Sequence, residues 1–85
     1  MELEILTPER KLFSGEVYGI QLPGINGSFE ILSQHAPLVS ALSNGKMRVL
    51  KDKTGGNTVS YQINGGFAEV LNNKVAVLVE GAVEI

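Results

Sequence analysis

The chain has 85 residues and no cysteine, and its seven basic and nine acidic residues give a formal net charge of −2. This length predicts one domain, residues 1–85, and the lack of cysteine excludes disulfides and thiolate sites. The slightly negative charge argues against nucleic-acid binding, which depends on neutralising phosphates with Lys and Arg. No apolar run approaches the ~20 residues of a membrane helix, and the N-terminus lacks the layout of a signal peptide. We therefore expect a soluble protein that would reach a membrane only through a partner.

Short apolar runs separated by Gly, Pro and Asn dominate the chain, and apolar residues nowhere recur at helical spacing over three turns. This pattern is typical of an antiparallel sandwich or barrel. Outside a central stretch described below, the predicted strands cover residues 2–5, 11–13, 16–22, 46–50, 58–64, 67–71, 74–79 and 83–85.

Two early segments depart from simple alternation. The pair Ser14-Gly15 predicts a turn after the short second run. Val17 is out of phase with Ile20 and Leu22. An extra residue near Gly19 would restore the phase, because a bulge lets the side chains change face. We therefore predict a bulged strand at this point.

The stretch from Gly24 to Gly45 organises the rest of the chain. It opens with a glycine-punctuated turn, continues into a short apolar run, breaks around the only histidine, His35, and resumes after Pro37. Glycine permits backbone conformations that other residues resist, and proline favours an extended shape in the residue before it. We expect one shaped connection between two buried strands, serving as a docking surface. Residues 37–43 are compatible with a strand or with a single helical turn.

The second half of the chain alternates more clearly. The run over residues 46–50 places two apolar side chains on one face and the cations Lys46 and Arg48 on the other. Residues 59–63 show the cleanest period of two, which predicts that Val59, Tyr61 and Ile63 point inward.

The last predicted strands carry specific turn signals. Gly65-Gly66 permits a sharp corner. Asn72-Asn73 predicts a tight hairpin, because asparagine tolerates the left-handed backbone that such a turn needs. Residues 75–79 are apolar on both faces, which predicts a central strand.

The candidate chemical groups form no recognisable reactive site. A hydrolytic triad needs three groups in mutual reach, and the chain offers one histidine, His35, and one aspartate, Asp52, without a nucleophile elbow. A metal site needs several His or Cys residues or a cluster of acids, and the chain has one histidine and no cysteine. Residues 24–28 are glycine-rich but lack the lysine of a phosphate loop. We expect no catalytic residue, no metal and no cofactor, and His35 fits either a local backbone hydrogen bond or a partner contact.

Several motifs occur together in one order. They are Phe13-Ser14-Gly15, Pro23-Gly24 through Gly27, Ile31-Leu32, His35-Ala36-Pro37-Leu38, Gly45 with Arg48, Gly65-Gly66-Phe67 with Glu69 and Val70, and Val75-Ala76-Val77-Leu78. In this order, over essentially all 85 residues, the chain resembles the N-terminal β-sandwich of the epsilon subunit of the bacterial-type rotary ATP synthase. That subunit corresponds to the mitochondrial delta subunit. No single motif is diagnostic, but their combination is specific.

The resemblance implies an all-β fold of two packed antiparallel sheets with about ten short strands. It implies a non-catalytic rotor subunit of a proton- or sodium-driven synthase, without cofactor, in the central stalk. The implied partners are the gamma subunit, the c-subunit ring and, indirectly, the F1 alpha/beta assembly. The implied location is peripheral, on the cytoplasmic face of the bacterial inner membrane. By resemblance, Ser28 lies in the loop that faces the c ring, while His35 and the turn at Thr7 and Pro8 lie toward gamma.

Two departures from the family pattern matter. Glycine and proline are common in the family where this chain has Glu30 and Ser33, and an acid is common where it has Ser28. The ring-facing charge would then have moved by two positions to a same-face neighbour, so we assign Glu30 to the ring side with Ser28. Many relatives also carry a C-terminal pair of helices that restrains ATP hydrolysis. Because the sequence ends at Ile85, where that pair would begin, we expect no C-terminal helical hairpin if this is the natural length.

The alternative function is a free-standing β-sandwich module that binds a protein or a sugar. Such a module would need a concave groove lined by aromatic side chains, and aromatics make up only 6% of this chain. The rotor role predicts instead an exposed apolar strip near Leu38, Val39 or the Phe13 turn, larger than a monomer needs.

Overall fold

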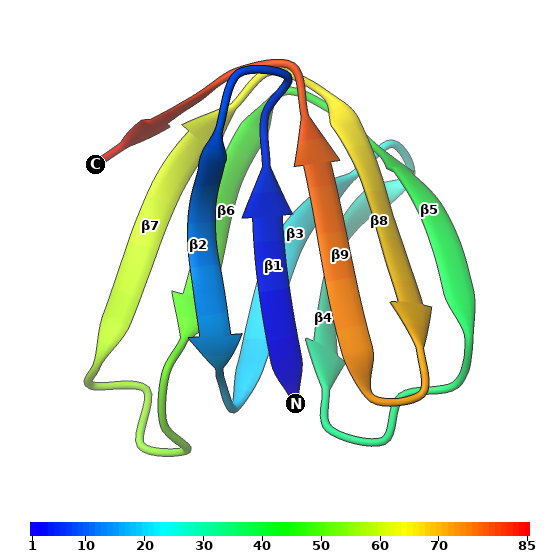
Figure 1. The fold of residues 1–85 in the computed structure, drawn as a ribbon, viewed down its shortest axis with the longest axis vertical. Helices are drawn as coiled ribbons and strands as arrows, with labels where there is room; N and C mark the ends of the chain where they lie inside the picture. Colours follow the sequence, from blue (N-terminus) through cyan, green and yellow to red (C-terminus); the bar gives the residue numbers. More distant parts are fainter.

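Ten short strands and no helix make up the protein in the computed structural model, which describes all 85 residues (Figure 1). The strands are β1 (Glu2–Leu6), β2 (Lys11–Glu16), β3 (Gly19–Gly24), β4 (Gly27–Leu32), β5 (Leu38–Leu42), β6 (Gly45–Leu50), β7 (Thr58–Ile63), β8 (Gly66–Leu71), β9 (Lys74–Val79) and β10 (Ala82–Glu84). The structure contains no helix that is long and apolar enough to cross a membrane.

The strands form two layers that join at one corner. The first layer has the order β2-β1-β9-β8-β5, and the second has the order β4-β3-β6-β7-β10. Figure 1 shows the first layer in front and the second behind. Gly24 of β3 pairs with Leu42 of β5, so the two layers are one sheet folded onto itself. The predicted two-sheet all-β sandwich is confirmed.

One pairing differs from the antiparallel prediction. β1 and β9 are parallel, with Leu3 opposite Val75 and Ile5 opposite Val77. β9 therefore lies between β1 and β8, which confirms that residues 75–79 form a central strand. Alternation along the chain does not reveal this pairing, because the two partners are far apart in sequence.

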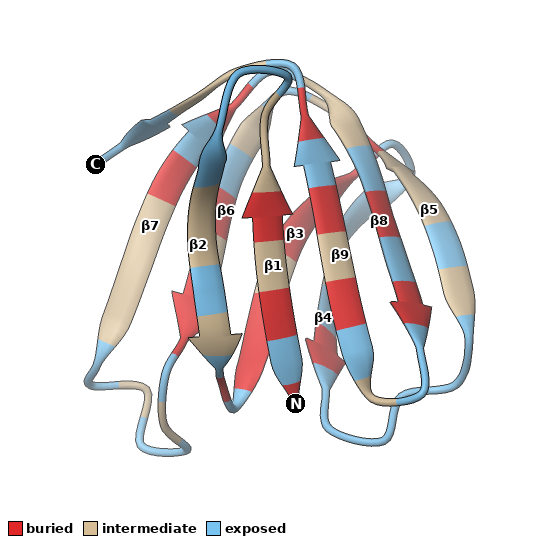
Figure 2. Ribbon diagram, in the orientation of Figure 1, coloured by how far each residue is buried: buried red, intermediate tan, exposed pale blue.

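Inward side chains of both layers meet in one apolar core. Figure 2 shows buried and more exposed residues alternating along β1 and β9, as expected for strands with one face inward. The core cluster contains 17 buried residues, and no polar or charged residue is buried. Tyr61 and Ile63 belong to it as predicted, whereas Val59 packs against it only partly buried.

The predicted turn at Ser14-Gly15 is wrong. Both residues lie inside β2, where Gly15 pairs with Leu3 of β1. The register of the β1–β2 strand pair shifts between Ile5 and Leu6 of β1, at the end nearer the turn that joins the two strands. Pairing with β1 supplies backbone hydrogen bonds along the whole strand, and this tertiary gain outweighs the local turn preference of a Ser-Gly pair.

The predicted bulged strand over residues 16–22 is also wrong. β2 ends at Glu16 and β3 begins at Gly19, so the intervening pair carries the chain from the first layer to the second. The N–H of Val17 donates to the carbonyl of Met1 over 2.8 Å, and that of Tyr18 donates to the carbonyl of Leu50 over 2.9 Å. The phase change at Val17 marks this crossing between layers.

The central stretch forms one largely exposed strand, β4, and one mostly half-buried strand, β5, and the expectation of two buried strands is wrong. β4 pairs only with β3, and of its residues only Ile31 is fully buried. β5 is a strand rather than a helical turn, and Leu42 is its one buried residue. β4 is an edge strand and needs an apolar side chain only where it touches the core, which explains its short apolar run.

Candidate partner-binding surfaces

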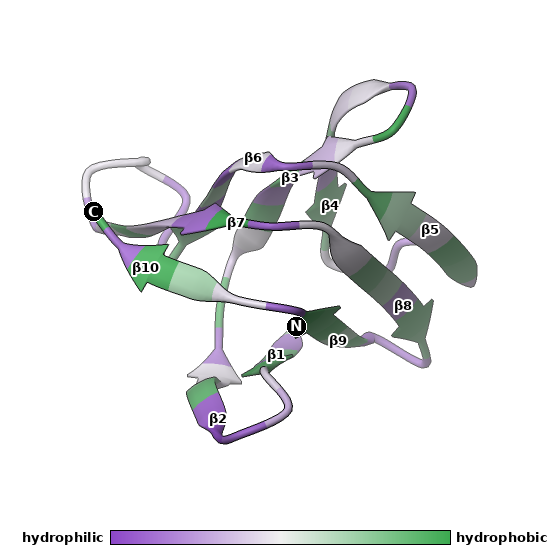
Figure 3. Ribbon diagram, turned by 90° about the horizontal axis from the view of Figure 1, so that it is seen from above, coloured by the Kyte–Doolittle hydropathy of each residue, from purple (hydrophilic) through white to green (hydrophobic).

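An apolar row crosses the outer face of the first layer, at the end where β1 and β9 finish. Phe67 of β8 lies opposite Ala41 of β5 on one side and opposite Leu78 of β9 on the other. Leu6 of β1 lies opposite Leu78 in turn. Directly opposite side chains on one face of a sheet are neighbours. These four residues are called the apolar row below, and Figure 3 shows β5, β8 and β9 grouped on the side of the molecule away from β10.

Two of the four residues of the apolar row are exposed, and Leu6 and Ala41 are half-buried. Phe67 is 58% exposed and Leu78 is 49% exposed. Further along the same face Val39 is 70% exposed and lies opposite Glu69 of β8, so the apolar strip larger than a monomer needs stays a prediction. Leu38 and Phe13 are half-buried and pack against the core, so the strip does not extend to them.

The turn that contains Thr7 and Pro8 borders the apolar row. A recess of about 320 Å³ is lined by both turn residues together with Gly66, Phe67 and Leu78, among others. Thr7 closes the turn, because its N–H donates to the carbonyl of Arg10 over 2.9 Å and its Oγ1 accepts from the Arg10 N–H over 3.2 Å. Two of the predicted gamma-side residues thus flank the largest exposed aromatic side chain of this layer.

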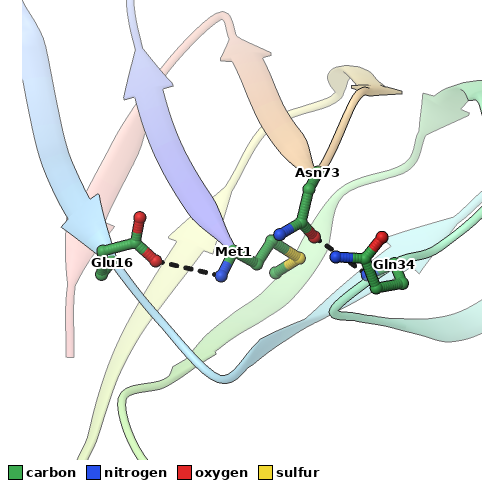
Figure 4. Close-up of polar contacts among 4 residues, drawn as sticks. All are labelled: Met1, Glu16, Gln34 and Asn73. Carbon is green, nitrogen blue, oxygen red and sulfur yellow. Dashed lines mark hydrogen bonds and ion pairs between the residues drawn. The ribbon is translucent and has the colours of Figure 1, made fainter.

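His35 lies at the other end of the strands. It is exposed in the loop between β4 and β5, and its Nδ1 lies 2.8 Å from the carbonyl oxygen of Ala36. The loop is held by a hydrogen bond of 2.9 Å from the N–H of Gln34 to Oδ1 of Asn73 (Figure 4). Asn73 precedes β9, whereas the Thr7-Pro8 turn follows β1, which runs parallel to β9. The structure therefore does not bring His35 and that turn together, and a single partner touching both must reach along the whole strand length.

Ser28 and Glu30 lie together on the outer face of β4. Both are exposed, and Oε1 of Glu30 accepts a hydrogen bond of 3.0 Å from Nε2 of Gln21 on β3. They line a recess of about 590 Å³ over β4, β3 and β6. The other residues that line it are Gln21, Leu22, Phe29, Lys46 and Arg48. The structure thus brings together the two residues that were assigned to the ring side, as their same-face spacing predicts.

Sequence reasoning found the common face of Lys46 and Arg48 but missed that they line one recess with Ser28 and Glu30 of β4. Their alternation with buried Met47 and Val49 was the available signal. Their approach to Glu30 depends on β3, which pairs with β4 on one edge and with β6 on the other. Pairing partners of this kind are not visible in a single strand's pattern.

Comparison with known proteins identifies the family. The family model described as ATP synthase, Delta/Epsilon chain, beta-sandwich domain matches residues 1–85. The ATP synthase epsilon chain of Chlorobium limicola is 48% identical over 80 residues, which cover 93% of this chain and 88% of that one. The epsilon chain of Caulobacter vibrioides is 43% identical over 84 residues, covering 99% and 94%. In the longer epsilon chain of Maridesulfovibrio salexigens, 48% identity extends over 94% of this chain and 54% of the relative.

Solved structures show the same fold. A chain in the Euglena gracilis mitochondrial ATP synthase structure of OSCP, F1 and c-ring superposes with a TM-score of 0.88 at 27% identity, covering 96% of this chain and 51% of that one. A chain in the central stalk and c-ring structure from Tetrahymena thermophila superposes with a TM-score of 0.79 at 17% identity, which speaks for the fold alone. Since the family match spans every residue and near full-length epsilon chains share over 40% identity, this chain belongs to the ATP synthase delta/epsilon chain family.

Proposed function

We propose that residues 1–85 act as one non-catalytic domain of the ATP synthase rotor, at the foot of the central stalk between the gamma subunit and the c-subunit ring. As part of the ATP synthase complex, the domain is a peripheral component on the cytoplasmic face of a bacterial membrane. It is linked to the F1 alpha/beta assembly through other subunits and has no direct contact with it. The resemblance to epsilon chains and the similarity to a chain of an F1 and c-ring assembly support this proposal.

The observation that carries the proposal is the apolar row beside the Thr7-Pro8 turn. Its exposed side chains stand on a sheet whose other face is the core, so the position of the row is held rigidly. A stable interface buries about 800 Å² on each partner. The accessible surface of the chain totals 4950 Å², so one such interface occupies much of one outer face. We assign the apolar row to gamma.

The ring side is assigned to Ser28 and Glu30 on the outer face of the second layer. The two assignments place the partners on opposite outer faces of one sandwich. A torque-transmitting part needs stiffness between its contacts, and two layers packed through a common apolar core supply it. His35, at the far end of the strands, stays a predicted gamma-side contact that a long partner surface would reach.

The experiment is complex formation with gamma, followed by size-exclusion chromatography. We expect a one-to-one complex with the unaltered chain. The double variant Phe67→Ser/Leu78→Ser removes the centre of the apolar row and is expected to weaken binding by about a hundredfold or more, because central hot spots contribute about 2 kcal/mol or more each. Circular dichroism checks that the double variant folds.

A matched control is Val83→Ser/Ile85→Ser, which removes two apolar side chains that are both 66% exposed but lie on and just after β10, in the other layer. This control should bind gamma as the unaltered chain does. Equal weakening by both double variants would contradict the assignment of the row. Absence of any complex with the unaltered chain would favour the alternative function, a free-standing binding module.

A further inference from the structure

The outer face of the second layer carries two cations without an acidic partner. The structure contains three ion pairs, and all lie on the first layer: the Met1 α-ammonium with Glu16, Lys11 with Glu4, and Lys74 with Glu2. Lys46 and Arg48, side by side on β6, have no carboxylate oxygen within 4.0 Å.

The recess holds two cations and one carboxylate. Lys46 and Arg48 line it together with Glu30, whose Oε1 accepts a hydrogen bond from Nε2 of Gln21. Two neighbouring cations without an ion pair attract and orient a partner group of negative charge.

We propose that the recess over β3, β4 and β6 binds a side-chain carboxylate from a polar loop of the c ring, with Lys46 and Arg48 as its cations. The inference rests on the proposed function, since it takes the ring as the partner of this face. The planar guanidinium of Arg48 presents paired donors that match a carboxylate, and Lys46 adds a second positive charge two residues along the strand.

Glu30 supplies the second half of the recognition. Gln21 pairs with Glu30 on one side and with Arg48 on the other, so these three residues form one row across the recess. Two strand spacings separate Glu30 from Arg48, which is about 10 Å. The matching ring loop therefore carries a cation and a carboxylate about 10 Å apart, facing Glu30 and Arg48 respectively.

The test uses the assembled rotor of gamma, c ring and this chain. Lys46→Gln/Arg48→Gln removes both cations of the recess, and Lys51→Gln/Lys53→Gln removes the same charge from the β6–β7 loop outside it. At low salt we expect the first variant to bind the ring about tenfold or more weakly, with a flatter salt dependence, and the second to bind nearly as the unaltered chain does. Binding of both variants to isolated gamma should be unchanged.

The outcomes separate the two proposals. If the unaltered chain binds the ring and Lys46→Gln/Arg48→Gln binds it equally well, the carboxylate site is overturned while the rotor role stands. If the unaltered chain binds neither gamma nor the ring, the rotor role itself fails. Saturable binding of inorganic phosphate at Lys46 and Arg48, without loss of ring binding in the double variant, would assign the recess to a free anion and overturn the inference.

Discussion

The backbone N–H of Gln34 donates a hydrogen bond of 2.9 Å to Oδ1 of Asn73, and this bond ties the β4–β5 loop to the β8–β9 hairpin. Both residues have left-handed backbones, with φ of 65° for Gln34 and 60° for Asn73. The carbonyl of Asn73 also accepts from the N–H of Glu2 over 3.2 Å. One asparagine thus connects a hairpin, a loop and the start of β1, close to the Met1 and Glu16 ion pair (Figure 4).

Replacing Asn73 by alanine should destabilise the protein by about 2 kcal/mol, of which about 1 kcal/mol is the lost hydrogen bond and about 1 kcal/mol is the left-handed backbone. Asn73→Gly removes the hydrogen bond but suits the backbone, so it should cost only about half as much. Urea denaturation followed by circular dichroism measures both free energies of unfolding. Equal values for the two variants would show that the backbone conformation contributes nothing.

Of all the glycines, Gly66 leaves the least space for a Cβ atom. Its φ is 146°, and a Cβ placed there meets the carbonyl oxygen of Leu78 and lies 2.9 Å from the Cα of Val79. Both belong to the central strand β9, which cannot move away without leaving its neighbours. We expect Gly66→Ala to cost about 3 kcal/mol or more in unfolding free energy.

Gly55→Ala is the control for Gly66→Ala. Its φ of 74° is also left-handed, but no atom lies within 4 Å of the added Cβ. The expected cost is the backbone term alone, about 1 kcal/mol. Thermal or chemical unfolding of the two variants separates the steric term from the backbone term, and a Gly66→Ala protein as stable as Gly55→Ala would argue against the close approach.

Ile31 anchors the edge strand β4 to the core. It is fully buried, while its neighbour Leu32 is 36% exposed. We expect Ile31→Ala to lower the free energy of unfolding by about 2–5 kcal/mol, through lost burial and the cavity left behind. Leu32→Ala should cost well under half of that, because less of its surface leaves water. A reversed order, measured by the same denaturation, would mean that β4 is held by its outer face.

Alkaline pH should destabilise the fold through Tyr61. Burial raises the pKa of Tyr61, and Glu84, which is opposite on β10, raises it further. Below pH of about 10 both folded and unfolded states keep the proton, so the group contributes no pH dependence there. As the pH rises above about 10 the unfolded chain ionises first, binds fewer protons than the folded state, and becomes relatively more stable.

The unfolding free energy measured between about pH 9 and 11.5 should therefore fall more steeply in the unaltered chain than in Tyr61→Phe. Tyr18→Phe should keep the steep fall and leaves Tyr61 as the only tyrosine for direct titration. Glu84→Gln should lower the pKa of Tyr61 by removing the neighbouring negative charge. Identical pH profiles for the unaltered chain and Tyr61→Phe would rule out this linkage.

Features that depend on neighbours in the chain were predictable. Asn72-Asn73 forms the two-residue hairpin with φ of 52° and 60°, and Gly66 takes a backbone that only glycine favours. Tyr61 and Ile63 point inward because alternation along a strand is a local property. Ser28 and Glu30 share a face for the same reason.

The strand-rich character of the chain, most of its turns and the alternation of faces along its strands could be predicted, because these follow from adjacent side chains and backbone preferences. The tertiary structure decided the crossing at Val17, the strand through Ser14-Gly15 and the parallel pairing of β1 with β9. It also decided that Lys46 and Arg48 line the same recess as Glu30, with β3 between them, and that His35 and Thr7 lie at opposite ends of the strands. Each of these depends on which distant strands share hydrogen bonds and core contacts, and that choice is made by the burial of the whole chain together.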